Sequence, residues 1–534
     1  MLDPACREMP YKPQPFDYEP IRPRRANSPE MPEDDERFTV SARPHGNAAA
    51  AAPDAEEWLS PKNRQRPSRV ETPLDAAAPE PPAPRTARSS VKRHNWVLRR
   101  GHTLSFVGLF LFTLVLYFRP YELFPALSSL RTLAFWIAVS TLLIFLPSQL
   151  AMEGNLTARP REVNLILLLT LAAFLSIPLA IDPGEAWGGF VEFAKVVVMF
   201  IVMVNVMRTE RRLRILLFLA LAVGCVVSLG AINDYQLGNF TVGGERIAGI
   251  IGGMFANSND LALHLVMMTP IAVALFFSTR NVIKKAFFGA CAGLMVAGNL
   301  VTFSRGGLLG LLGALVVLLW KLGRRHRVLV FVVALSLGFS LIIFMPGMMM
   351  ERIASIFDPT SEMSGAGSAV SRRALLMRSL LVMARHPVLG VGLGNFHYVS
   401  IREQVSHNSY TQIGAELGVA AMLIYMMFMW TAFKRVRGIE RETLADKHPT
   451  RFYYLAVGLE ASIVGYMISS FFGSVAFQHY LYYLIGYSIC LHRIYETSKP
   501  ATIPAPVAIE SETKRGAGRG RKWRASLPET ANSQ

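Results

Sequence analysis

Apolar runs long enough to cross a lipid bilayer dominate the middle of this chain. Between residues 98 and 498 many runs reach about 17–22 residues with few charged side chains, which is the length that spans roughly 30 Å of hydrocarbon. Backbone groups at that depth must be satisfied within the segment itself, so helices are the expected elements. The sequence therefore predicts an all-α polytopic membrane protein, in keeping with 51% apolar residues over a length of 534.

We expect twelve membrane spans, because the segments between them alternate in charge. The even-numbered spans end in segments rich in Arg and Lys, such as 208–214 and 434–441, whereas 181–187 and 471–474 carry neither. Cytoplasmic loops collect Lys and Arg, so one orientation satisfies every short loop and places both termini in the cytoplasm. The predicted spans are 102–118, 126–147, 163–181, 188–207, 212–232, 259–278, 284–303, 306–322, 327–345, 409–433, 452–470 and 474–494.

The two ends of the chain differ in composition from the span region, which we place at 98–498. Residues 1–97 and 499–534 contain few large apolar side chains, so we expect disordered cytoplasmic tails. The second tail carries the basic run KRGAGRGRKWR, which suits contact with anionic membrane lipids. Cytoplasmic loops and this tail account for the net charge of +17, so we expect no nucleic-acid partner.

Two longer segments fall on the extracytoplasmic side of this topology, about 233–258 and about 346–408. Within the second, residues 370–385 have apolar side chains at helical spacing, which predicts an amphipathic helix lying over the membrane surface. Loops of this length in a compact protein are often functional.

Arginines on the outer side run against the charge bias of membrane proteins. Arg305 lies in TFSRGG between two spans, Arg372 and Arg373 begin the predicted surface helix, and Arg246 lies in the first outer segment. Snorkelling to the interface or a solvated helix face would explain each one separately. Together in one cavity they would bind an anion, since guanidinium groups match phosphate oxygens bidentately. These segments lack an Asp-x-Asp cluster, so we expect no metal site.

His407 and Asn408 stand at the end of the glycine-rich interval 385–418, directly before a predicted span. A histidine here is either a proton acceptor for a hydroxyl group or a hydrogen-bonded structural residue. Asn408 is either a substrate contact or the cap of the following helix. Glu416 is an acid inside the predicted span, where it either serves the function or bonds a neighbouring helix.

With these residues assembled, the chain resembles the O-antigen ligase and polymerase family of bacterial envelope glycan assembly. Four motifs carry the resemblance, in family order and at family-like spacing, within about 100–495. They are RIAGIIGGMFANSNDLA at 246–262, TFSRGGLLGLL at 302–312, SRRALLMRSLLVMARHPVLGVGLGNF at 371–396 and HNSYTQIGAELGVAAMLIY at 407–425.

The resemblance implies a C-type membrane glycosyltransferase fold with a periplasmic loop at 346–408, in the bacterial inner membrane. It implies transfer of a glycan from an undecaprenyl-diphosphate carrier to a polysaccharide, lipid or protein acceptor, without metal or cofactor and with inversion. Arg305 and Arg372 would hold the diphosphate, with Arg373 the competing assignment, and His407 would activate the acceptor hydroxyl. The candidate substrate-binding residues are Arg246, Asn257, Arg373, Asn408 and Glu416.

A transporter or flippase of lipid-linked glycans is the main alternative. It would show symmetry between halves and broken helices with charges at the membrane midplane. This sequence has no clear repeat and its polar motifs gather at the outer face, which favours the enzyme. A third possibility, a non-catalytic assembly scaffold, would leave Arg305 and His407 dispensable.

Overall fold

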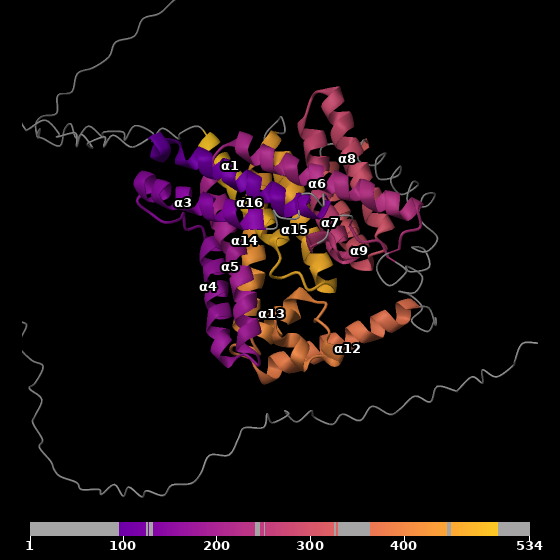
Figure 1. The fold of residues 1–534 in the computed structure, drawn as a ribbon. Coiled ribbons are helices and arrows are strands. Elements are labelled where there is room, and N and C mark those ends of the chain that lie inside the picture. The colour runs from indigo at the N-terminus through magenta and orange to yellow at the C-terminus, as the bar shows by residue number, and fades with distance from the viewer. Residues whose placement is uncertain are drawn as a thin grey trace, which may run out of the picture. The chain divides into compact units, whose positions relative to one another are not determined.

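The computed structural model describes residues 96–123, 127, 132–240, 246–249, 251, 253–324, 327–328, 364–445 and 450–499. All of them belong to the compact unit Arg88–Gln534. Nearly all of both predicted tails, and most of the predicted span 327–345, lie outside the described residues. The elements of the described part are all helices (Figure 1). They are α1 (Trp96–Phe118), α2 (Pro120–Leu123), α3 (Leu133–Glu153), α4 (Arg161–Ser176), α5 (Pro183–Val206), α6 (Glu210–Gln236), α7 (Ser258–Ser278), α8 (Val282–Val301), α9 (Arg305–Gly323), α12 (Ser364–Arg385), α13 (Ser409–Leu417), α14 (Val419–Leu444), α15 (Arg451–Ser469) and α16 (His479–Ser498), with short 3-10 helices η2 (Ile177–Leu179), η3 (Gly253–Phe255), η4 (Asn395–Val399), η5 (Ile401–Glu403) and η6 (Ser470–Phe472).

Nine helices within these described ranges are long and apolar enough to cross a membrane: α1, α3, α4, α5, α6, α7, α9, α14 and α15. Each overlaps a predicted span. The helices α8 and α16 match the predicted spans 284–303 and 474–494. Their polar and charged side chains make them less apolar than the nine helices above. A polytopic helical membrane protein is confirmed, and the count of twelve spans stays a prediction.

The predicted span 409–433 is wrong as a single helix. The chain breaks at Gly418 into the nine-residue helix α13 and the long helix α14, which continues to Leu444. Gly418 has a φ of +88°, and a Cβ atom there would lie 2.3 Å from the carbonyl oxygen of Val388. Only glycine accepts both conditions, so the helix ends here. Glu416 therefore lies in a helix too short to span a membrane, and not inside a continuous span as predicted.

The helix α12 covers the predicted surface helix 370–385 and begins earlier, at Ser364. It packs against α13, and α13 in turn contacts α4; both α12 and α13 are drawn in orange in Figure 1. The part of the predicted loop 346–408 that precedes Ser364 lies outside the described residues.

The helix α7 lies at the centre of the bundle, where it packs against α6, α8, α9 and α15. Of its apolar stretch 78% is buried, compared with 22% for α3 at the periphery. Small residues allow α15 to approach closely: a Cβ atom on Gly458 would lie 2.6 Å from the Cβ of Ala274. The Ser462 hydroxyl also donates to the Met267 carbonyl at 2.6 Å. Such contacts hold helices together in lipid, where the hydrophobic effect does not.

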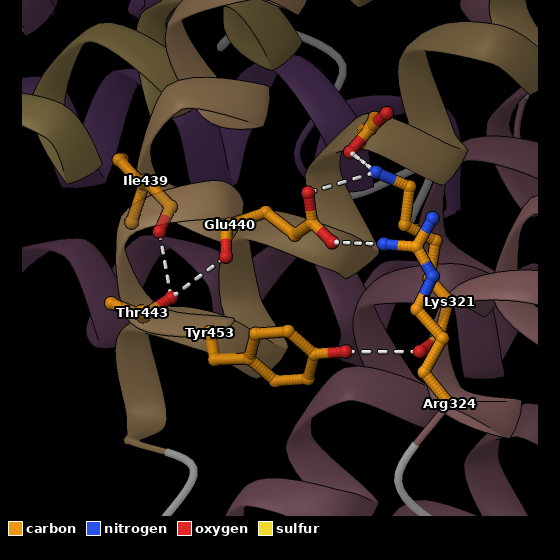
Figure 2. Close-up of polar contacts among 7 residues, drawn as sticks. Lys321, Arg324, Ile439, Glu440, Thr443 and Tyr453 are labelled. Atoms are coloured by element: carbon orange, nitrogen blue, oxygen red, sulfur yellow. Dashed lines mark hydrogen bonds and ion pairs between the residues drawn. The ribbon is translucent and has the colours of Figure 1, made fainter. Parts of the chain in front are cut away.

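A buried cluster of charged residues, the Lys321 cluster, joins the ends of α9 and α14 to α15 (Figure 2). The Nζ atom of Lys321 lies 3.0 Å from Oε2 of Glu440 and 2.9 Å from Oε2 of Glu460. Arg324 pairs with the other oxygen of Glu440 at 3.3 Å, and the Tyr453 hydroxyl donates to the Lys321 carbonyl at 2.9 Å. Buried charges need such pairing, so the cluster fixes these three helices relative to one another.

Candidate functional site

Arg305 is the first residue of α9, and the cap of this helix ties it to α7. The Ser304 hydroxyl oxygen accepts the Gly307 N–H at 3.2 Å and donates to Oδ1 of Asn259 at 2.7 Å. Ser304 is a favourable N-cap residue because its side chain satisfies a free N–H of the first turn. Arg305, which is half-buried, is thereby held beside the start of α7.

The start of α13 places His407 and Asn408. The Oδ1 atom of Asn408 accepts hydrogen bonds from the N–H groups of Tyr410 and Thr411 at 3.0 and 3.1 Å. Asn408 is therefore the N-cap of α13, which is one of its two predicted roles. Its Nδ2 is buried and has no hydrogen-bond partner in the described part of the chain. His407 has a φ of +52°, a conformation that is uncommon outside glycine and is often found at functional sites.

The segment 473–475, between η6 and α16, holds His407 from the other side. The His407 N–H donates to the Ser474 hydroxyl at 2.9 Å. The Ser409 hydroxyl donates to the Gly473 carbonyl at 2.7 Å and accepts the Val475 N–H at 3.0 Å. His407 is thus fixed by contacts far away in sequence as well as by its own helix.

Two positive charges, those of Arg372 and Arg246, act on the imidazole of His407. Burial lowers the pKa of His407 below its ordinary value, and the charges of Arg372 and Arg246 lower it further. Burial also lowers the pKa of the Arg372 guanidinium, with a further contribution from the charge of Arg305. These interactions link Arg246, Arg305, Arg372 and His407 into one electropositive site. The guanidinium groups of such a site can bind an anion, and the imidazole of His407 can accept a proton.

The structure distinguishes the two arginines that the sequence left as competitors. Arg372 is half-buried and interacts with Arg305 and His407, whereas the side chain of Arg373 is exposed. Arg372 is therefore the member of the pair that belongs to the electropositive site.

A pocket adjoins this site, bounded by the beginnings of α7 and α9 and the end of α15. Its cavity volume is about 10 Å³, which is room for about one water molecule. Ser304 and Gly306, which flank Arg305, line it together with Gly473 of the segment that holds His407. The remaining lining residues are Asn259, Asp260, Leu263, Gly307, Ser469, Phe472 and Val475.

Glu416 is enclosed by the glycine-rich loop that follows α12. The N–H groups of Val391 and Gly392 donate to the carbonyls of Ala415 and Glu416, both at 3.0 Å. Gly390 has a φ of +64°, and a Cβ atom there would lie 2.2 Å from the carbonyl carbon of Glu416. The Glu416 carboxylate accepts a hydrogen bond from Nε2 of Gln412 at 3.2 Å. The backbone of Glu416 therefore joins the loop to α13, and the residue is buried where the two meet.

Asn257 caps α7, since its Oδ1 accepts the Asn259 N–H at 2.9 Å. This gives Asn257 a structural role, and a substrate contact from it stays a prediction. Across the described ranges, no group of three or more His, Cys, Asp and Glu side chains is arranged to hold a metal ion.

Three residues beside these elements were missed by the sequence analysis: Arg119, Asp260 and Ser474. The Arg119 guanidinium lies against Gly253, where a Cβ atom would meet its Cζ at 1.9 Å. Arg119 follows an odd-numbered predicted span, so the charge bias of the outer side also marks it as an exception. Asp260 is an acid within a predicted span, the criterion that selected Glu416. Nothing in the sequence distinguishes Ser474 from other loop serines.

One protein-family model matches part of this chain. Residues 290–426 match the family model described as O-Antigen ligase, a range that includes Arg305, Arg372 and His407. No curated protein matches the chain. Among solved structures, a chain from "Structural coordination of polymerization and crosslinking by a peptidoglycan synthase complex" is 15% identical with a TM-score of 0.36, covering 62% of this chain and 96% of that chain. That TM-score is too low to support an argument about the fold. Residues 290–426 of this membrane protein are therefore similar to the O-antigen ligase family.

Proposed function

We propose that the chain is an inverting, metal-independent glycosyltransferase that takes a glycan from an undecaprenyl-diphosphate carrier. The acceptor is a hydroxyl group of a polysaccharide, a lipid or a protein. The observation that carries the proposal is the electropositive site of Arg246, Arg305, Arg372 and His407, within and next to an O-antigen ligase domain.

In the proposed reaction the neutral imidazole of His407 takes the proton of the acceptor hydroxyl as its oxygen attacks the anomeric carbon. The bond between that carbon and the diphosphate oxygen breaks, and the electron pair leaves with undecaprenyl diphosphate. A single displacement inverts the anomeric configuration. Arg305 and Arg372 stabilise the charge that develops on the leaving diphosphate, because guanidinium groups remain positive throughout.

We further propose that this site faces the periplasm of a bacterial inner membrane and that both termini are cytoplasmic. Basic residues gather at the opposite helix ends, where Arg208 pairs with Glu153, Arg435 with Glu162, and Lys321 with its two acids. This distribution agrees with the charge bias of cytoplasmic membrane surfaces.

Envelope glycans of a deletion strain complemented with single variants test the proposal. At equal membrane levels, Arg305→Ala and His407→Ala should accumulate lipid-linked glycan as the deletion does. Arg385→Ala, which removes an exposed arginine at the end of α12, should restore the wild-type glycans. Restoration by all three variants would overturn the assignment and favour a transporter or scaffold.

A further inference from the structure

The residue that follows α1 lies in a backbone conformation that suits glycine better than arginine. Arg119 has a φ of +41°, and its N–H donates to the Val115 carbonyl at 3.0 Å. Glycine is common in this conformation directly after a helix, because a side chain is strained there. Such strain persists only where the surrounding contacts hold it, so the contacts of the Arg119 side chain indicate its role.

The Arg119 side chain covers the segment that leads into α7. We call this segment the Arg246 loop; its described residues are 246–249, 251 and 253–257. The atoms nearest to a Cβ on Gly253 would be Cζ, Nη1 and Nη2 of Arg119, so the guanidinium lies directly against the Gly253 backbone. Two residues earlier in the chain, the ring of Tyr117 stacks on that of Phe255, with 6.2 Å between the centroids. The end of α1 therefore contacts both end residues of η3.

The Arg246 loop carries one arginine of the electropositive site at its beginning. The Gly249 N–H donates to the Phe255 carbonyl at 2.8 Å, which closes the loop onto η3. Ile247 and Ile251 are fully buried on either side of Gly249. Because Ile247 directly follows Arg246, the packing of the loop fixes the backbone of Arg246. The end of α1 holds η3 and thereby the loop.

The charge of Arg119 acts on the first two residues of α16. The charges that act on His407 are those of Arg372 and Arg246. The route from Arg119 to the proposed base therefore runs through the Arg246 loop, by way of the position of Arg246.

We propose that Arg119 is a positioning residue for glycan transfer: its guanidinium holds the Arg246 loop so that the charge of Arg246 acts on His407. This inference rests on the proposed function and adds a residue that acts through Arg246, without touching the substrate. Removal of the guanidinium would release the loop, and the charge of Arg246 would move away from the imidazole. The pKa of His407 would then rise toward its ordinary value.

The pH dependence of glycan transfer by the purified full-length protein in proteoliposomes tests the positioning role. The probe is lipid-linked glycan extracted from a strain that lacks the protein. Arg119→Gln should move the acidic limb of kcat/KM to higher pH, because the base must be neutral and its pKa has risen. On this limb kcat/KM should fall about 2- to 10-fold, the loss expected for one polar contact. A lower Tm with an unchanged limb would show a purely structural role and overturn the proposal.

Gly253→Ala perturbs the same contact from the other side and leaves every charge in place. Its methyl group would occupy the position of the Arg119 guanidinium, so the limb should again move to higher pH. Arg402→Gln is the matched control, since Arg402 is an exposed arginine that also has a positive φ, +53°. Its limb should coincide with that of wild type. An unchanged limb in Gly253→Ala would contradict the role of this contact.

A double variant shows whether Arg119 acts through Arg246. Arg246→Gln should move the limb to higher pH at least as far as Arg119→Gln does. Adding Arg119→Gln to Arg246→Gln should produce no further movement, because no charge remains for the loop to position. Additive movements would mean that Arg119 acts on His407 by another route, and would overturn the proposal.

Chemical modification separates failure of this inference from failure of the proposed function. Diethyl pyrocarbonate reacts with neutral imidazole, so the pH dependence of its reaction with His407, followed by mass spectrometry, gives the pKa of His407 without catalysis. If the wild-type protein transfers no glycan, the proposed function fails. The pKa of His407 should still be higher in Arg119→Gln than in wild type, and equal values would contradict the positioning role.

Discussion

The backbone N–H of His407 donates a hydrogen bond to the hydroxyl of Ser474, with 2.9 Å between the two atoms. The two residues come from the segment before α13 and the segment before α16, so the bond joins distant parts of the chain. The neighbouring bonds of Ser409 with Gly473 and Val475 strengthen the same junction. The position of the proposed base therefore depends on the loop that follows α15.

Ser474→Ala removes the acceptor of the His407 N–H without touching the imidazole. The loss of one such bond is worth about 0.5–1.5 kcal/mol, so kcat should fall about 2- to 10-fold while KM stays the same. Initial rates with extracted lipid-linked glycan measure this. Ser498→Ala, at the exposed end of α16, is the matched control. A wild-type kcat for Ser474→Ala would show that this bond does not position His407.

Arg372→Gln should shift the pH dependence of the reaction. The positive charge of Arg372 lowers the pKa of His407, so its removal moves that pKa back toward the ordinary value. The base must be neutral, so the rate falls as pH drops through this pKa. The acidic limb of kcat/KM should therefore lie at higher pH in Arg372→Gln than in wild type. The limb in Arg385→Gln should not move, and an unchanged limb in Arg372→Gln would contradict the proximity of the two groups.

Gly390→Ala and Gly394→Ala separate steric conflict from backbone strain. Both glycines have a positive φ, +64° and +79°, which costs an alanine about 1–2 kcal/mol. A Cβ atom at position 390 would also lie 2.2 Å from the backbone of Glu416, whereas at position 394 it meets nothing within 4 Å. Thermal unfolding in detergent should show a larger drop in Tm for Gly390→Ala. Equal Tm values would mean that the loop does not pack on α13 as described.

Lys321→Met should destabilise the protein, because it leaves Glu440 and Glu460 buried with less positive charge nearby (Figure 2). Removal of one partner from a buried ion pair typically costs about 3–5 kcal/mol. Lys195→Met, which breaks an exposed pair with Glu192, should cost about 0–1 kcal/mol. Adding Glu460→Gln to Lys321→Met should recover part of the lost Tm. Equal Tm values for Lys321→Met and Lys195→Met would exclude a stabilising role for the cluster.

The sequence predicts the membrane helices well because each one is a continuous apolar run, which can be recognised without knowing what the run packs against. It does not predict the break at Gly418, since the cause is the carbonyl of Val388 packed against that glycine, a contact formed only by folding. Candidate arginines could be chosen from the outer-side charge bias, but the choice between Arg372 and Arg373 needed the face of α12. Ser474 and Asp260 lie next to residues that other segments of the chain contribute. The linear sequence does not show these neighbours, so it cannot single out either residue.

The most direct test of the proposed chemistry follows the fate of the donor. Proteoliposomes are prepared with lipid and glycan extracted from a strain that lacks the protein, which supplies both donor and acceptor. The wild-type protein should release undecaprenyl diphosphate and form a new glycosidic bond of inverted configuration, and His407→Ala should do neither while still binding the donor. Movement of intact lipid-linked glycan across the bilayer without release of undecaprenyl diphosphate would contradict the account, as would wild-type release by His407→Ala.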